Sequence, residues 1–181
     1  MRLIKYDEVD RCVRASAVNP MIIERLPITA WRRLKSLRER AVRDSPDAFG
    51  STLAEILSVS QEQWIEQLEK LPTLVACEQD ADIGMARVSF AIDSAEAWLR
   101  SMWVAPDFRG RRVGEQLAEA AIALARDRGC TKMFLEVADH MVPAISLYKR
   151  LGFDPTGYKS HFPCPKAHIT EHRRALVLKR K

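Results

Sequence analysis

Paired cysteines and long apolar segments are both missing from this sequence. No uninterrupted apolar run approaches the ~18 to 20 residues that a membrane-spanning helix needs, so a membrane partner is not expected. Charged residues also interrupt the first 20 residues, which argues against a secretory signal and predicts a cytoplasmic protein. The four cysteines stand far apart without a CxxC pair, so we expect them to be reduced and structural. They are Cys12, Cys77, Cys130 and Cys164.

Two common nucleotide-binding signatures are absent as well. The chain has neither the GxxxxGK(S/T) spacing of a Walker loop nor a GxGxxG run after the first strand of a dinucleotide-binding unit. It also has no internal repeat, low-complexity tract or linker. With 181 residues, 47% of them hydrophobic and 29% charged, the chain has the composition of one globular domain. Residues 1–19 read as an N-terminal extension or tail, and residues 20–181 as the domain.

The chain does have a regular succession of strand and helix patterns. Strands are predicted at 21–26, 73–78, 82–92, 97–105 and 131–137, with two more at 153–158 and 173–180, and helices at 30–43, 52–70, 113–128 and 143–150. This order predicts an α/β (α+β) protein. Its central sheet is expected to be mixed and mostly antiparallel, to have about six to seven strands, and to be flanked by helices.

A basic loop stands where the helix at 113 begins. It contains Arg109, Arg111 and Arg112, with Gly110 and Gly114 beside them. A helix start exposes unpaired backbone N–H groups and a partial positive charge, and glycines let an anion approach closely. Since the fork of arginine suits phosphate oxygens, the loop predicts a site for a phosphorylated ligand. A solvated basic turn is the alternative that the loop alone leaves open.

This loop and a second motif about thirty residues further on together resemble the GNAT-type N-acetyltransferases. In that family a strand ends in V-x-P, R-G-x-G-x-G opens a helix, and A-x-x-L-Y-x-x-x-G-F marks a later helix. The matching residues are Val104, Pro106, Arg109, Gly110 and Gly114 for the first part, and Ala144, Leu147, Tyr148, Gly152 and Phe153 for the second. The resemblance implies the acyl-CoA N-acyltransferase fold over nearly all of the chain after the first 19 residues.

The resemblance also implies acetyl-CoA as the acyl donor. The loop would hold its pyrophosphate, through Arg109, Gly110, Arg111, Arg112, Val113 and Gly114. Met102, Trp103 and Val104 would pair with the pantetheine arm through their backbone groups. The thioester would then lie between this strand and the strand at 131–137, with Met141 and Tyr148 completing the cofactor-binding set.

Two positions depart from the family pattern. Arg112 stands where the family usually has the first glycine of its turn, and Met141 where it usually has an asparagine. An arginine can still offer its backbone N–H to the cofactor where its φ is negative, and it adds positive charge. The methionine removes one polar contact to the cofactor.

By the same resemblance, the reaction is direct attack of an amine on the thioester. Tyr148 is the candidate acid, because a phenol titrates near about 10 and stays protonated at neutral pH. A backbone N–H around Trp103 or Val104 is the candidate donor to the carbonyl oxygen. Glu136 is the nearest acidic candidate for the general base; it could equally be a hydrogen-bond partner or a solvated strand residue, and a water chain could replace it.

The acceptor, a primary amine of a small molecule or a peptide, is expected between the first two helices and their joining loop. Asp44 and Asp47 could attract the positive charge of an amine, and Phe49 could line the pocket. The competing interpretation is that all three are turn, cap and core residues.

Other functions are less favoured by the sequence. His161, Cys164, His168 and His172 have spacing near that of a zinc site, but prolines crowd the cysteine, and no metal is expected. The basic helix at 30–43 could face a nucleic acid, yet no aromatic stacking platform or reader motif accompanies it. The departures at Arg112 and Met141 keep a non-catalytic acyl-CoA-binding module as the alternative to an enzyme. The sequence leaves a homodimer open.

Overall fold

The computed structural model describes residues 21–92 and 94–179. The predicted N-terminal extension at 1–19 lies outside these residues. A seven-stranded sheet in the order β1-β2-β3-β4-β5-β7-β6 forms the centre. Its strands are β1 (Ile22–Arg25), β2 (Thr73–Glu78), β3 (Ala81–Phe90), β4 (Glu96–Val104), β5 (Lys132–Ala138), β6 (Asp154–His161) and β7 (Thr170–Val177). Neighbouring strands are antiparallel except β4 and β5, which are parallel, so the predicted mixed sheet is confirmed.

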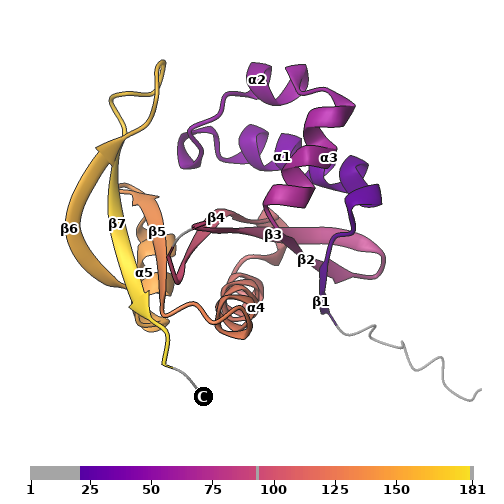
Figure 1. Ribbon diagram of the computed structural model, residues 1–181. Helices are drawn as coiled ribbons and strands as arrows, with labels where there is room; N and C mark the ends of the chain where they lie inside the picture. The colour runs from indigo at the N-terminus through magenta and orange to yellow at the C-terminus, as the bar shows by residue number, and fades with distance from the viewer. Residues whose placement is uncertain (1–20, 93, 180–181) are drawn as a thin grey trace, which may run out of the picture.

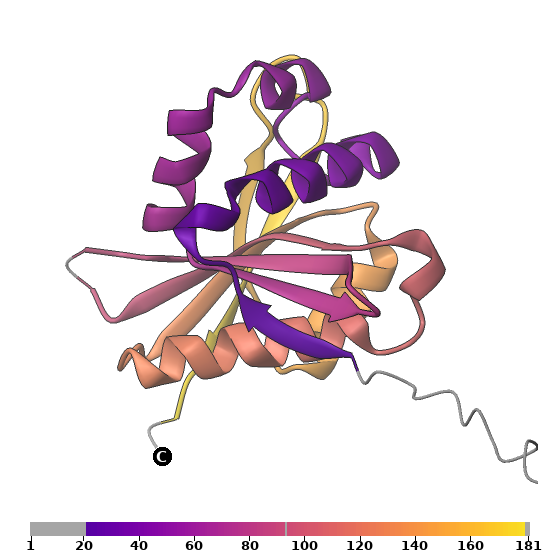
Figure 2. The ribbon, with the colours of Figure 1, turned by 90° about the vertical axis from the view of Figure 1, so that its right-hand side faces the viewer.

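Helices cover both faces of this sheet. They are α1 (Trp31–Asp44), α2 (Leu53–Ser58), α3 (Gln61–Lys70), α4 (Val113–Asp127) and α5 (Val142–Arg150). The first three lie over one face and α4 runs along the other (Figures 1 and 2). The buried Tyr148 of α5 belongs to the same core as the apolar residues of α4. A second core lies between α1, α3 and the sheet, where Leu34, Leu37 and Trp64 are fully buried.

The single helix predicted at 52–70 is two helices. Ser60 accepts a hydrogen bond from the backbone N–H of Gln63, and the Gln63 side chain accepts one from the backbone N–H of Ser60. This capping box starts α3 anew, after Val59 has left the helix in an extended conformation. Thr52 and Glu55 form an equivalent box at the start of α2. Apolar periodicity alone did not separate the two helices.

The parallel strands β4 and β5 separate after only three residue pairs. Their pairing runs from Glu96–Lys132 to Trp98–Phe134 and ends there, although both strands continue. Close by, β4 carries a bulge against β3, and Ser101 in the bulge has a φ of +51°. A bulge bends its strand and re-aims the side chains around it. The open edge that results is where the candidate site lies.

Candidate active site

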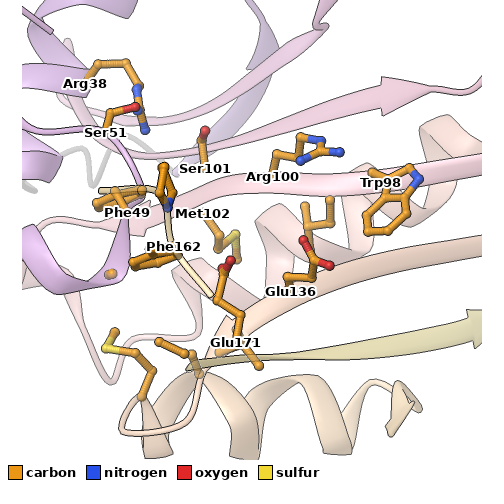
Figure 3. A pocket seen from close by; sticks show the side chains of 18 of the residues that line it. Arg38, Phe49, Ser51, Trp98, Arg100, Ser101, Met102, Glu136, Phe162 and Glu171 are labelled. Atoms are coloured by element: carbon orange, nitrogen blue, oxygen red, sulfur yellow. The ribbon is translucent and has the colours of Figure 1, made fainter. Parts of the chain in front are cut away.

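Two cavities meet at the opening between β4 and β5. The larger, of about 570 Å³, extends toward α1, the loop after it, and the edge formed by β5 and β7 (Figure 3). The smaller, of about 390 Å³, extends toward the loop before α4. Ala48, Phe49, Met102, Met141, Ala144 and Tyr148 line both. A ligand in one cavity can therefore reach a ligand in the other at these shared residues.

The smaller cavity ends on the first turn of α4. The first hydrogen bond within this helix runs from the backbone N–H of Gln116 to the carbonyl of Arg112, at 3.1 Å. The N–H groups of residues 113–115 therefore have no partner inside the helix and can receive an anion. Gly110, with a φ of +75°, has open space where a Cβ would be. A Cβ on Gly114 would lie in ordinary van der Waals contact, 3.4 Å from Leu147 and 3.6 Å from Met102, so a larger side chain there would compete for space with residues that line the cavity.

The structure brings the predicted cofactor-binding residues together at this cavity, with one exception. Met102, Trp103, Val104, Arg109, Gly110, Arg112, Val113, Gly114, Met141 and Tyr148 all line it. Arg111 does not. Its guanidinium donates to Glu78 at 2.6 Å and lies over the ring of Phe108. The guanidinium of Arg111 is thus paired with a carboxylate of β2 and is not directed at the helix start.

Asp44, at the end of α1, joins that helix to the site. Its carboxylate accepts hydrogen bonds from Trp103 Nε1 at 2.9 Å, from Ser45 Oγ at 2.7 Å, and from the guanidinium of Arg109. Burial acts to raise the pKa of Asp44, but these three donors outweigh it and the pKa is lowered. Asp44 therefore fixes β4 and the basic loop in place, and its carboxylate is not free for the amine that the sequence analysis assigned to it.

Asp47, the second predicted acceptor residue, lies elsewhere. It is exposed in the short 3-10 turn Pro46–Ala48 and lines neither cavity. Phe49, two residues further on, is buried and lines both cavities. The predicted role of Phe49 in the pocket wall is consistent with this position, whereas that of Asp47 is not.

Lys166, in the connection between β6 and β7, holds this loop. Its ammonium donates to the carbonyl oxygens of Pro46, Phe49 and Ser51, at 2.6, 2.9 and 3.1 Å. Phe162 and Pro163, from the same connection, line the larger cavity together with Ser51. The wall of the larger cavity is thus built from two segments that are distant in sequence and joined by one side chain.

Arg112 adopts a conformation that favours glycine. It is the N-cap of α4, with a φ of +62° and a ψ of +10°. The backbone N–H of Arg112 was expected to bind the cofactor if its φ were negative, but its φ is positive. Its side chain is mostly exposed and pairs with Glu115 at 3.1 Å. The left-handed conformation costs a non-glycine residue about 1–2 kcal/mol, and no buried contact offsets that cost here.

Replacing Arg112 with glycine is therefore expected to stabilise the fold. Glycine adopts a positive φ without the cost that arginine bears, and this gain exceeds the conformational entropy that glycine loses on folding. The free energy of unfolding should therefore rise by about 0.5–1 kcal/mol. Denaturation in urea measures this change. Arg112→Ala is the matched control, because it removes the same charge but keeps the cost of a positive φ. Equal stability of the glycine and alanine variants would contradict the assignment of strain to Arg112.

Tyr148, on α5, lies at the junction of the two cavities. Its side chain is buried, and its ring packs edge-on against Phe153 with the ring centroids 5.9 Å apart. Burial raises the pKa of the Tyr148 phenol above its ordinary value. The hydroxyl therefore stays protonated at neutral pH and can act as a donor in the cavity.

Two carboxylates lie on the opposite wall of the larger cavity. The register of β5 against β7 pairs Glu136 with Arg173 and Ala138 with Glu171. Because side chains alternate along a strand, Glu136 and Glu171 share one face of the sheet, as Figure 3 shows. Arg173 donates to Glu136 Oε1 through Nη2 at 3.0 Å and Nε at 3.2 Å. Glu136 is thus a hydrogen-bond partner in this structure, one of the three interpretations that the sequence left open.

Glu171 is the functional candidate that the sequence analysis missed. Burial, and then the charge of Glu136, raises its pKa to about 7, although Arg100 acts in the opposite direction. The final strand was predicted to begin at Arg173, but β7 begins at Thr170. The alternation of residues 171, 173 and 175 could have extended the strand, but only the pairing with β5 places Glu171 in a cavity.

The basic residues of α1 contact their own protein. Arg33 forms ion pairs with Glu24 and Asp82, each at 2.6 Å. Arg40 donates to the carbonyl of Asp82 at 2.8 Å and lies over the ring of Trp103. These contacts take up side chains that a nucleic-acid surface would present to phosphates.

In residues 21–92 and 94–179, no three His, Cys, Asp or Glu side chains cluster in a way that could hold a metal ion. No helix in those same ranges has the length and apolar character to cross a bilayer.

The family model and the related proteins that match this chain all indicate the same family. Residues 34–153 match the sequence model of the acetyltransferase (GNAT) family. Streptothricin acetyltransferase of Streptomyces lavendulae is 37% identical over 101 residues, which are 55% of this chain and 53% of that protein. The ribosomal protein bS18-alanine N-acetyltransferase of Salmonella typhimurium is 37% identical over 92 residues, 49% of this chain and 61% of that one. The chain spans about half the length of the curated relatives it matches.

Solved structures agree on the fold. A GNAT-family acetyltransferase from Streptococcus pneumoniae superimposes with a TM-score of 0.76 at 17% identity, covering 88% of this chain and 100% of the other. The structure of yncA from Salmonella typhimurium with acetyl-CoA superimposes with a TM-score of 0.72 at 20% identity, covering 90% of this chain and 96% of the other.

Proposed function

Because the chain belongs to the GNAT acetyltransferase family, we propose that it transfers the acetyl group of acetyl-CoA to a primary amine of a small molecule or peptide. The observation that carries this proposal is the meeting of two cavities at Tyr148, one ending on an anion-receiving helix start and the other on two carboxylates. Such an arrangement suits a reaction between two ligands that enter from different sides. The cytoplasmic location and the homodimer stay predictions from the sequence.

The residues around the smaller cavity fit acetyl-CoA. The N–H groups at the start of α4 would hold the pyrophosphate, and Gly110 and Gly114 leave room for its close approach. The edge of β4 beyond Trp98, where pairing with β5 has ended, would pair with the pantetheine arm. Of the arginines, Arg112 stands at the helix start, while the guanidinium of Arg109 lines the cavity and also donates a hydrogen bond to Asp44. When bound, acetyl-CoA supplies the activated acetyl group as a thioester.

Glu171 in the larger cavity and Tyr148 at the junction would transfer the protons of the reaction. Glu171 takes a proton from the acceptor amine, directly or through water, as the amine nitrogen bonds to the carbonyl carbon. A backbone N–H of β4, near Trp103 or Val104, donates to the carbonyl oxygen as negative charge develops there. Tyr148 donates its hydroxyl proton to the sulfur as the carbon–sulfur bond breaks. The products are an acetamide and the free thiol of coenzyme A; Glu171 then releases its proton to solvent, and Tyr148 regains one from solvent.

We assign the base to Glu171 and a supporting part to Glu136. Arg173 donates two hydrogen bonds to Glu136, and this contact fixes the orientation of the Glu136 carboxylate. Burial, and then the negative charge of Glu136, raises the pKa of Glu171 toward neutrality, where a base is most effective. The earlier candidate, Glu136, would thus act on the reaction through Glu171.

Calorimetry with acetyl-CoA and a screen of acetyl-CoA consumption test the proposal. We expect acetyl-CoA to bind in the micromolar to millimolar range, on the order of the KM values of about 1 μM to 1 mM that are typical of enzymes. Gly114→Val is the control, because its side chain would occupy space at the start of α4 where the pyrophosphate is expected, and it should reduce the heat of binding. The screen covers amino acids, polyamines, aminoglycosides and peptide N-termini. Binding without any turnover would favour the non-catalytic acyl-CoA-binding module, and absence of binding would overturn both functions.

A further inference from the structure

Arg38 is a buried cation on the wall of the larger cavity. It lies on α1 among the apolar residues of the second core, and only 5% of its surface is exposed. Its guanidinium stacks over the ring of Phe49, 5.1 Å from the ring centroid. Its Nη1 atom is buried and makes no hydrogen bond to any part of the chain that the structure describes. A buried donor without a partner costs stability, so its retention needs an explanation.

The surroundings of Arg38 add positive charge instead of neutralising it. Arg87, on β3, is also buried, and donates to the side chain and the carbonyl of Gln67 at 3.1 and 3.2 Å. Burial, and then the charge of Arg38, lowers the pKa of Arg87 to about 9. Burial alone lowers the pKa of Arg38 to about 10, which leaves it protonated at neutral pH. This end of the cavity therefore attracts an anion.

Other charged groups on the cavity wall make hydrogen bonds within the protein, and those of Glu55 and Arg100 are to uncharged partners. Glu55 accepts a hydrogen bond from the backbone N–H of Thr52 at 2.7 Å, and Arg100 donates to Ser89 at 3.0 Å. Glu136 is bonded to Arg173. Figure 3 shows Arg38 beside Ser51 on one side of the cavity, and Glu171 and Glu136 on the other side. The cavity thus presents Arg38 on one wall and the carboxylates of Glu136 and Glu171 on the opposite wall.

We infer that Arg38 binds a carboxylate of the acceptor, so that the acceptor carries both a primary amine and a free carboxylate. This inference rests on the proposed function, because the amine would be directed at Glu171 and Tyr148. A guanidinium fork matches the two oxygens of a carboxylate. A single guanidinium beside an aromatic ring suits this monoanion better than a phosphate dianion, which needs more donors. Free amino acids and the C-termini of short peptides share this chemistry.

The same argument disfavours acceptors with several positive charges. A diamine such as 1,4-diaminobutane would place its second ammonium near the uncompensated charge of Arg38. The acceptor selectivity is then opposite to the one that Asp44 and Asp47 suggested, since neither aspartate offers a free carboxylate to the cavity. The carboxylate of the acceptor would supply the negative charge that the described chain does not pair with Arg38.

A binding experiment tests this inference without any turnover. The probes are 3-fluorobenzoate and its neutral counterpart 3-fluorobenzamide, observed by ¹⁹F NMR with the full chain. We expect the benzoate signal to broaden and the benzamide signal to stay sharp. Arg38→Met, which keeps much of the side-chain volume, should abolish the difference. Arg38→Lys keeps the charge without the fork, and should weaken benzoate binding several-fold. Equal behaviour of the two probes with the wild-type chain, or benzoate binding that persists in Arg38→Met, would overturn the inference.

A kinetic experiment separates this inference from the proposed function. Amino acids, ω-amino acids and dipeptides are each compared with the matching carboxamide, at saturating acetyl-CoA. We expect kcat/KM to favour the carboxylate member at least about tenfold, because an analogue that leaves a buried donor unpaired is rejected, and Arg38→Met to reduce this preference to within about twofold. Turnover that is equal for acids and amides would refute the role of Arg38 while leaving the acetyltransferase intact. Failure of acetyl-CoA to bind would refute the proposed function, and the fluorobenzoate result would still decide whether Arg38 receives carboxylates.

Discussion

Replacing Tyr148 with phenylalanine is expected to lower kcat by about 10²–10³-fold, within the range that one general acid contributes. The hydroxyl lies where the two cavities join, and burial keeps it protonated by raising the pKa of the phenol. Without it, the leaving sulfur would lose the buried hydroxyl donor at the junction of the two cavities. The ring itself stays in phenylalanine, so its edge-on contact with Phe153 is preserved.

Steady-state kinetics with any acceptor found in the screen measures this loss. The control is calorimetry with acetyl-CoA, in which Tyr148→Phe should bind with nearly the wild-type Kd, because the phenol is assigned to the chemical step. If acetyl-CoA binding and kcat fell by the same factor in Tyr148→Phe, Tyr148 would have a packing role. An unchanged kcat would remove Tyr148 from the mechanism.

Replacing Glu171 with glutamine is the second change with a large expected effect. In the wild-type chain, kcat/KM should rise with pH and show an inflection near 7, where Glu171 loses its proton and becomes a base. In Glu171→Gln this inflection should disappear, and kcat/KM at pH 8 should fall by about 10²-fold or more. Glu136→Gln is the informative comparison. Because the charge of Glu136 raises the pKa of Glu171, its removal should move the inflection below 7 while most of the activity is kept.

The same carboxylate makes a prediction about stability. An unfolded glutamate titrates near about 4.3, whereas Glu171 in the folded chain titrates at about 7. A raised pKa means that the folded state holds the proton more tightly, so stability is lost as the pH rises from the unfolded value through the folded one. Glu171→Gln should therefore raise Tm at pH 8 and leave it nearly unchanged at pH 4. A lower Tm at both values would mean that Glu171 serves the fold and not the reaction.

The parts of the site that depend on neighbouring residues in the sequence could be predicted. Gly110 and Gly114 act through the backbone of one loop and the helix that follows it, and their effect follows from local chemistry. Tyr148 belongs to a motif within one helix. The predicted elements occur in the predicted order, but the capping box at Ser60, which is also a local signal, divides the helix at 52–70, and β7 begins at Thr170 rather than at Arg173.

The parts that depend on contacts across the fold could not be predicted. Arg109 and Arg111 have charges that suit phosphate, but whether those charges are free depends on Asp44 and Glu78, which come from α1 and β2. Glu171 acquires its pKa from the register between β5 and β7 and from burial. Arg38 belongs to a run of basic residues that reads as a solvated helix face, until the packing of α1 on the sheet buries it.

The three hydrogen bonds of the Lys166 ammonium constrain how the acceptor site can change in evolution. This ammonium connects the loop after α1 to the turn between β6 and β7, across about 115–120 positions of the sequence. A change of length in either segment would break three hydrogen bonds at once and displace Phe49 from the wall. New acceptor preferences should therefore arise by coordinated replacement of both segments, and chimeras that exchange only one of them with a relative should lose catalytic efficiency toward both parental acceptors.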